Sequence, residues 1–254
     1  MPDLPTAFSA VADPGASASE ITMQSPQAGR DLTEEDGANG PRADVADVAG
    51  ESANAPDGAA PARKRPKPGE RRVQILQTLA AMLEEPGADR ITTAALAAKL
   101  SVSEAALYRH FASKAQMFEG LIEFIEQSIF TLINQITERD TDPALQARRI
   151  VFMLLQFGEK NPGMARVMVG DALVFENERL STRMNQFFDK IESQLRQSLR
   201  AAAERAGSQT PTVDANGRAS ALTALAVGRL QRFTRSGFKR SPTEQIEMAL
   251  GLLT

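Results

Sequence analysis

The sequence predicts an all-α protein in which a three-helix N-terminal unit, built around a helix-turn-helix, precedes a larger helical domain. Three observations predict this class. Apolar residues recur at three- and four-residue spacings over most of residues 73–253, without a convincing alternating strand. Residues 91–114 read as two short helices joined by a tight turn. Residues 1–62 contain few large apolar side chains.

The first 62 residues are rich in Ala, Gly, Pro, Ser and Asp. They cannot bury enough surface to offset the entropy lost on ordering, so we expect a disordered acidic tail. Residues 1–60 hold 11 acids and 2 bases, a net charge of −9, so residues 61–254 carry +6 although the whole chain carries −3. A basic folded part suits a polyanionic partner.

Composition argues against several classes of protein. The chain has no cysteine and one histidine, His110, and it lacks a Walker loop, a GxGxxG after a strand and an HExxH motif. We therefore expect no enzyme activity, no metal and no cofactor. No run approaches the ~18 apolar residues of a membrane span, and no signal peptide is visible. We expect a cytoplasmic protein without a membrane partner.

A basic arm opens the ordered part of the chain. Residues 63–72, RKRPKPGERR, contain six Lys or Arg and one Glu. A helix is predicted next, from about Val73 to Leu83, ending near Pro86-Gly87. A charged run is often a solvated linker. Placed directly before a helix-turn-helix, this one is expected to track phosphates or enter the minor groove.

The helix-turn-helix follows at residues 91–114. Thr92 or Thr93 can cap the first short helix, whose buried face is Leu96, Ala97 and Leu100. Ser101-Val102 makes the turn, and Ser103 caps the second helix. Leu107 and Phe111 are expected to pack inward. A generic helical hairpin would share this pattern, and the basic arm in front favours a DNA-binding unit.

The second short helix is the predicted reading element. Ala105 and Ala106 are short enough for close approach to base edges. Glu104 either complements the helix dipole or accepts from cytosine N4. His110 is expected to be structural or to face phosphate. The predicted DNA-binding residues are Arg63, Lys64, Arg65, Arg71, Arg72, Thr92, Thr93, Ser103, Glu104, Ala105, Ala106, Tyr108, Arg109, His110 and Lys114.

Amphipathic helices account for the remainder. Ser113 and Gln116 predict a capping box at the start of a long helix to about Thr137. Further helices are expected at 143–160, 162–173, 176–205, 214–236 and 243–253, with a polar loop at 207–213. We divide the chain into a tail (1–62), a DNA-binding domain with its arm (63–115) and a domain for dimerisation and partner binding (116–254).

The motif YRHFASKAQMFEGLI, residues 108–122, resembles the TetR-type DNA-binding family. Segments 90–114, 121–129, 157–163, 184–200 and 232–239 resemble, within it, the nucleoid occlusion branch called SlmA. The resemblance implies a homodimer on palindromic double-stranded DNA, located on the nucleoid, that antagonises the division protein FtsZ.

The same resemblance implies a docking groove for the C-terminal tail of FtsZ, with Phe124, Lys160 and Asn161 as its residues. From the residues alone, Phe124 is equally a core residue, and Asn161 before Pro162 is a helix stop. The alternative function is a ligand-responsive TetR-type repressor, although the apolar helices at 143–157 and 180–199 offer few polar groups for a ligand. A helical protein without DNA is the third possibility.

Overall fold

The computed structural model describes residues 69–85 and 90–254 and confirms the all-α class, since no strand occurs within these ranges. The predicted tail, the arm residues Arg63, Lys64 and Arg65, and the Pro86-Gly87 helix end lie outside them. The elements are α3 (Glu70–Glu84), α4 (Thr93–Lys99), α5 (Glu104–Tyr108), α6 (Lys114–Arg139), α7 (Pro143–Lys160), α8 (Pro162–Met168), the 3₁₀ turn η1 (Asp171–Leu173), α9 (Glu178–Arg205), α10 (Pro211–Arg235) and α11 (Ile246–Leu253).

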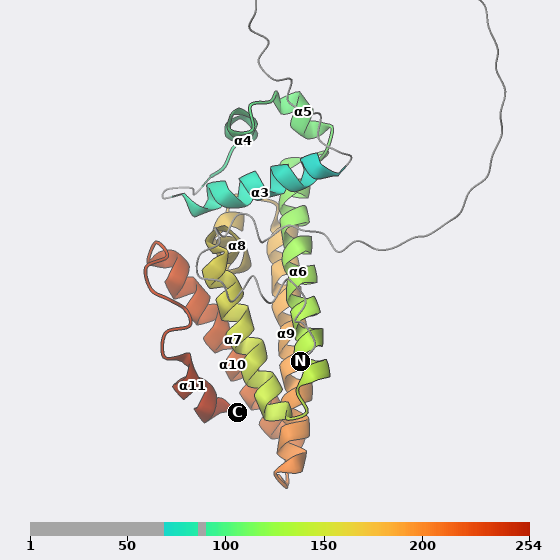
Figure 1. Ribbon diagram of the computed structural model, residues 1–254, viewed down its shortest axis with the longest axis vertical. Helices are drawn as coiled ribbons and strands as arrows, with labels where there is room; N and C mark the ends of the chain where they lie inside the picture. The colour runs from blue at the N-terminus through green and yellow to red at the C-terminus, as the bar shows by residue number, and fades with distance from the viewer. Residues whose placement is uncertain (1–68, 86–89) are drawn as a thin grey trace, which may run out of the picture.

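The small unit formed by α3, α4 and α5 sits on one end of an elongated helical bundle (Figure 1). Helix α3 lies across that end, with α8 directly beneath it, and α6 runs from the small unit down the length of the bundle. Helices α7, α9 and α10 complete the bundle, and α11 lies on its outer side next to the chain end.

Several helix boundaries differ by a few residues from those predicted, among them the starts of α3 and α9, and three differences have a visible local feature. The expected helix at 162–173 breaks into α8 and η1 because Gly170 adopts a left-handed conformation with φ 84°. Helix α10 begins at Pro211 rather than at 214, since proline suits the first helical position. Helix α11 begins at Ile246 rather than at 243, after Gln245 with φ 52°.

The start of α6 follows the predicted capping pattern. The hydroxyl of Ser113 accepts a hydrogen bond from the backbone N–H of Gln116 at 3.2 Å. The Gln116 amide oxygen accepts in turn from the N–H of Ala112 at 2.8 Å, one residue earlier than in the usual capping box. Two otherwise unpaired donors at the junction between the small unit and the bundle are thereby satisfied.

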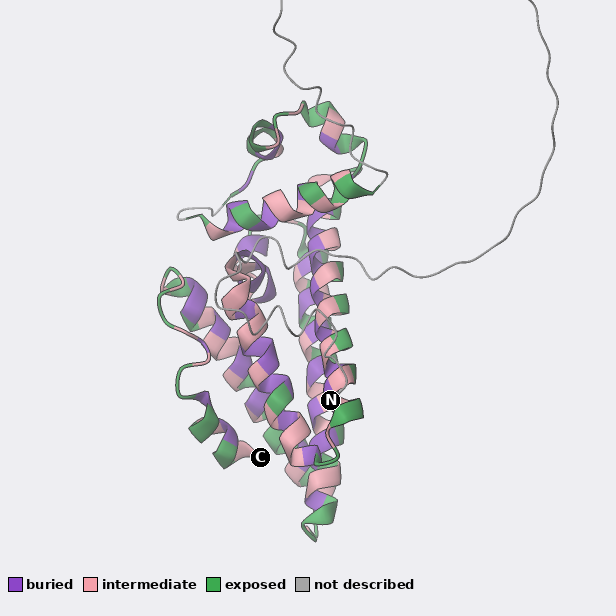
Figure 2. Ribbon diagram, viewed as in Figure 1, coloured by how far each residue is buried: buried purple, intermediate pink, exposed green. Residues whose placement is uncertain are grey.

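One hydrophobic cluster runs through both parts of the molecule. It joins Ile75 and Leu79 of α3 to Leu107, Phe111 and the inward face of the bundle. In Figure 2 the buried residues line the facing sides of the bundle helices, while exposed residues dominate the outer faces. The two predicted domains therefore share a continuous core.

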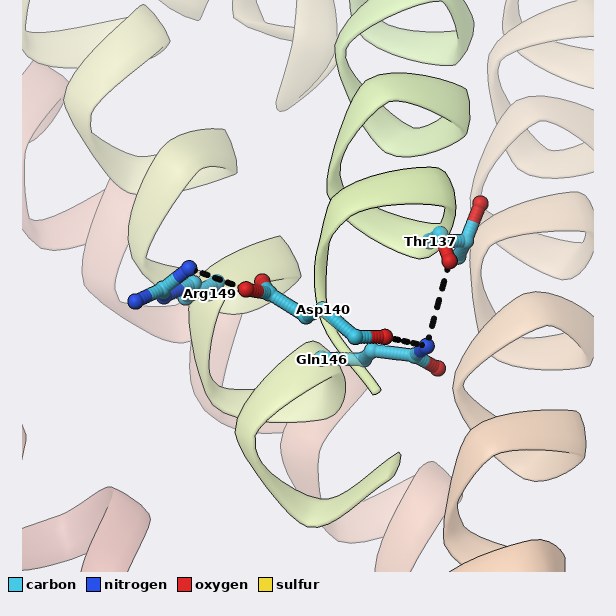
Figure 3. Close-up of polar contacts among 4 residues, drawn as sticks. All are labelled: Thr137, Asp140, Gln146 and Arg149. Atoms are coloured by element: carbon cyan, nitrogen blue, oxygen red, sulfur yellow. Dashed lines mark hydrogen bonds and ion pairs between the residues drawn. The ribbon is translucent and has the colours of Figure 1, made fainter. Parts of the chain in front are cut away.

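At the end of the bundle farthest from α4 and α5, Gln146 joins three helices. Its amide nitrogen donates to the carbonyl oxygens of Thr137 at 3.3 Å and Asp140 at 2.6 Å (Figure 3). Its amide oxygen accepts from the buried Ser198 hydroxyl of α9 at 3.1 Å. Arg149 forms an ion pair with Asp140. The α6–α7 turn is thus tied to α9 through polar side chains.

Close packing joins α3 to the start of α8. A Cβ added at Gly163 would lie 2.1 Å from the carbonyl oxygen of Ala80, so only glycine permits this approach. Arg166 donates to the carbonyl of Leu83 at 3.3 Å. Burial raises the pKa of the Glu84 carboxyl, an effect opposed by a hydrogen bond from the Gly163 backbone. The small unit therefore rests on the bundle through a tight backbone contact.

Candidate nucleic-acid interface

Side-chain caps define both helices of the helix-turn-helix. Thr92, rather than Thr93, caps α4: its hydroxyl accepts from the N–H of Ala95 at 3.1 Å. Ser103 caps α5 by accepting from the N–H of Ala106 at 3.2 Å. Of the two threonines that the sequence offered as the cap of α4, Thr92 is the cap and Thr93 is the first residue of the helix.

The turn between the helices requires a backbone conformation that the sequence did not signal. Ser101 has φ 54°, a left-handed value usually taken by glycine. Val102 donates its N–H to the carbonyl of Ala97 at 3.0 Å and packs against the core. Leu96, Leu107 and Phe111 are fully buried, which fixes the angle between α4 and α5.

Helix α5 presents its polar side to solvent. Glu104, Ala105, Tyr108 and Arg109 are exposed, whereas Ala106 is half-buried. Glu104 accepts a hydrogen bond from the Thr93 hydroxyl at 2.6 Å, which links the starts of α4 and α5. That contact favours the structural interpretation of Glu104 over contact with cytosine.

Two arginines at the start of α3 differ in their surroundings. Arg72 donates to the carbonyl oxygen of His110 at 2.8 Å, and its guanidinium lies 4.2 Å from the centre of the Phe111 ring. Arg71 donates to Gln74 at 2.7 Å on the exposed side of the same helix. Arg72 therefore connects α3 to the end of α5, and His110 takes part through its backbone.

Lys114, predicted as a DNA contact, makes contacts within the protein. It begins α6, is partly buried, and forms an ion pair with Glu176 in the segment between η1 and α9. Its ammonium also lies 5.6 Å from the centre of the Phe118 ring. In this structure Lys114 joins the small unit to the bundle.

The residues predicted for partner docking lie on α6 and at the α7–α8 junction. Phe124 is half-buried and packs against the core, so part of its ring stays accessible to a partner. Lys160 ends α7 and is half-buried. Asn161 donates its amide to the carbonyl of Phe157 at 2.8 Å, as expected for a helix stop.

Sequence reasoning missed one exposed apolar pair. Val174 and Phe175, just before Glu176, are 69% and 67% exposed. The sequence did contain a signal for this exposure: two large apolar residues stand together in the short segment before Asn177, which caps α9.

Two further findings concern the described residues alone. They contain no group of three or more side chains suited to hold a metal ion. No described helix has the length and apolar character needed to cross a bilayer.

Comparison with known proteins agrees with this geometry. Residues 75–121 match the model for bacterial regulatory proteins of the tetR family, and residues 142–254 match the tetracyclin repressor-like C-terminal domain of the SlmA-like type. Solved structures share the fold: PfmR of Thermus thermophilus aligns with a TM-score of 0.57 at 20% identity, covering 72% of this chain and 94% of its own. FadR of Bacillus subtilis, solved with stearoyl-CoA, aligns with a TM-score of 0.57 at 14% identity, covering 71% of this chain and 96% of its own.

Two relatives are more similar in sequence. The nucleoid occlusion factor SlmA of Vibrio vulnificus is 52% identical over 189 residues, which covers 74% of this chain and 96% of the relative. SlmA of Salmonella paratyphi A is 51% identical over 187 residues, covering 73% and 94%. The chain therefore belongs to the SlmA family of TetR-type proteins. DNA binding and dimer formation follow from this membership, as does its place among regulators rather than enzymes.

Proposed function

We propose that the chain is a nucleoid occlusion factor whose dimers bind palindromic chromosomal sites and, when bound to DNA, antagonise assembly of FtsZ. It then acts in the cytoplasm, on the nucleoid. The observation that carries this proposal is the 52% identity to an SlmA protein over 96% of that relative's length.

DNA reading is assigned to α5 and the residues around it. Ser103 fixes the start of α5, Ala105 leaves room for base edges, and exposed Tyr108 and Arg109 are positioned for phosphates or bases. Thr92, Arg71 and the basic residues of 63–67 are assigned to the flanking DNA backbone. Two recognition helices in a dimer with twofold symmetry would read half-sites about 34–36 Å apart, or a multiple of it.

We assign supporting roles to three other predicted residues. Glu104 and Thr93 hold α5 against α4 through their 2.6 Å hydrogen bond. Arg72 does the same for the end of α5 through the His110 carbonyl. Their replacement should weaken DNA binding through loss of geometry rather than loss of a contact.

Phe124, Lys160 and Asn161 are assigned to the FtsZ tail. Phe124 offers a partly exposed ring on α6, and Lys160 offers a cation at the end of α7 next to the α3–α8 contact. A peptide with acidic and apolar residues would suit this pairing. Because α8, which follows Lys160, packs on α3, a peptide bound at Lys160 would lie close to the DNA-binding unit, and this supports an effect of DNA on its binding.

The test begins with genome-wide mapping of bound sites, followed by FtsZ sedimentation with purified protein and one mapped duplex. Loss of FtsZ polymer with the duplex, and little or none without it, supports the proposal. Unchanged polymer at saturating duplex refutes it. If bound sites are confined to a few promoters and a metabolite releases them, the repressor alternative holds instead.

Variants separate the two surfaces. Arg109→Ala should weaken duplex binding, while Arg200→Ala on the far part of α9 should not. Phe124→Ala should spare duplex binding and reduce FtsZ antagonism. Phe130→Ala, another half-buried phenylalanine of α6, is the matched control for lost packing and should spare both activities. Equal effects of the two phenylalanine variants would refute the groove assignment.

A further inference from the structure

Positive charge gathers where α10 ends. Residues 229–241 contain five Lys or Arg and no Asp or Glu. Arg232 and Arg235 lie in the last turn of α10, and Lys239 and Arg240 follow in the loop. These four residues, the α10-end cluster, are exposed. None of the four forms an ion pair with another residue that the structure describes.

The fold does little to offset this charge. Asp171, which contacts the end of α10, accepts a hydrogen bond from the Thr234 hydroxyl at 2.9 Å rather than from a cation. Arg232 and Arg235 are three residues apart on the helix, a spacing at which like charges repel. The dipole of α10 offsets part of this repulsion, but its effect falls off within the last turn. The two cations of the loop therefore add positive charge that an external anion would stabilise.

The loop that carries Lys239 and Arg240 has a defined backbone. The Ser236 hydroxyl accepts from the N–H groups of Lys239 at 3.1 Å and Arg240 at 2.9 Å, and donates to the carbonyl of Phe233 at 2.8 Å. Phe238 adopts φ 65°, and its ring centre lies 5.2 Å from that of Phe233. Because the backbone is ordered in advance, less entropy is lost when a partner binds these cations.

The α10-end cluster adjoins Lys160 at the end of α7. The carboxylate of Glu159 accepts hydrogen bonds from the hydroxyls of Ser241 and, at 2.7 Å, of Thr243. Lys160 directly follows Glu159, and Arg240 directly precedes Ser241. The two cations therefore flank one hydrogen-bonded contact between α7 and the loop. Positive charge continues from the docking surface assigned to Lys160 onto the end of α10.

The position of the cluster favours an acidic polypeptide over DNA as its partner. In Figure 1 the end of α10 lies on the bundle side of α3, whereas α4 and α5 lie on the opposite side of that helix. A duplex that contacts α5 is thus separated from the cluster by α3. An acidic peptide bound at Lys160 meets the cluster directly.

We propose that the α10-end cluster binds an acidic segment of the FtsZ tail, so that the docking surface extends from α7 onto α10. This inference rests on the proposed function, which assigns that tail to Lys160. Attraction between exposed charges accelerates association and weakens as salt increases. The cluster therefore attracts the tail, and the surface around Phe124 fixes its position.

The test measures binding of fluorescently labelled FtsZ to the full chain, with a mapped duplex kept saturating at each salt concentration. One variant combines Lys239→Gln with Arg240→Gln, and a second combines Arg232→Gln with Arg235→Gln. At about 50 mM salt each should bind FtsZ roughly fivefold more weakly than the unchanged chain. At about 300 mM the difference should shrink below about twofold, since the Debye length is then only about 6 Å.

A matched control removes the same charge elsewhere. Arg200→Gln combined with Arg205→Gln neutralises two exposed cations at the far end of α9 and should leave FtsZ affinity within about twofold. An equal loss in this control would overturn the proposal, because net charge alone would then explain the effect. Thermal melting and sedimentation establish that each variant is folded and has the oligomeric state of the unchanged chain.

Two other results would overturn the proposal while the proposed function stands. One is unchanged FtsZ affinity at low salt in both cluster variants, with affinity lost in Phe124→Ala. The other is weaker duplex binding by the cluster variants with FtsZ affinity unchanged, which would assign the cluster to DNA. Absence of FtsZ binding by the unchanged chain at saturating duplex would instead refute the proposed function, together with this inference.

Discussion

Replacement of Gly163 by alanine should disturb the contact through which α3 of the DNA-binding unit packs on α8. The added Cβ would lie 2.1 Å from the Ala80 carbonyl oxygen and 3.0 Å from its carbonyl carbon. The distance to the oxygen is about 1.3 Å shorter than the 3.4 Å at which ordinary contact begins. Because the atoms approached belong to backbone, α3 and α8 must separate. Overpacking of this kind costs about 1–3 kcal/mol.

The cost should appear as a melting temperature lower by about 2–12 °C, given about 2–4 °C per kcal/mol for a protein of this size. Melting is compared at one protomer concentration, because dimer formation contributes to stability. The affinity for a specific duplex should fall as well, since α3 carries Arg71 and Arg72. Gly217→Ala is the matched control, as nothing lies within 4 Å of its added Cβ. Wild-type melting and duplex affinity in Gly163→Ala would refute the reasoning.

Three further changes test separate contacts. Glu84→Gln removes a carboxyl whose pKa is raised by burial, so its charged form is disfavoured in the folded state. The variant should melt slightly higher at pH 7, and the gain should vanish as pH falls towards 4.5; a gain that persists there would count against this explanation. Ser113→Ala removes the cap of α6 and should cost about 1 kcal/mol in urea unfolding, with no loss expected for exposed Ser220→Ala. Gln146→Leu removes the hydrogen bonds to the Thr137 and Asp140 carbonyls and to the Ser198 hydroxyl, and should lower the free energy of unfolding by about 1–3 kcal/mol. Hydrogen exchange should become faster at the α6–α7 turn and stay unchanged elsewhere.

The sequence predicted those features that depend on neighbours along the chain. Caps at Ser103 and Ser113 and the end of α7 before Pro162 were predicted correctly, because each rests on contacts within a few residues. The left-handed Ser101 and the split at Gly170 were missed because neither serine nor an isolated glycine specifies that conformation alone.

Features that depend on the rotation of one helix against another could not be predicted. The pairing of Lys114 with Glu176 joins residues 62 positions apart, and nothing local in either segment signals it. Burial of Phe124 shows the same limit: its spacing fits the apolar stripe of α6, yet it lies at the stripe's edge. The DNA-contact and FtsZ-contact residues remain predictions for this reason, because a contact also depends on the partner's shape.

The length of helix α6 allows a movement at the DNA-binding end to reach the opposite end of the bundle. It is a single rod of 26 residues, about 39 Å long, that starts beside α5 and ends at the turn held by Gln146. Arg183 of α9 pairs with Glu126 at 2.6 Å, at the middle of α6, and can serve as a fulcrum. A tilt of about 5° about this point displaces the far end of α6, roughly 20 Å away, by about 2 Å. A fluorescent label at exposed Glu138 should therefore report, from the opposite end of the molecule, a change in orientation that begins at the DNA.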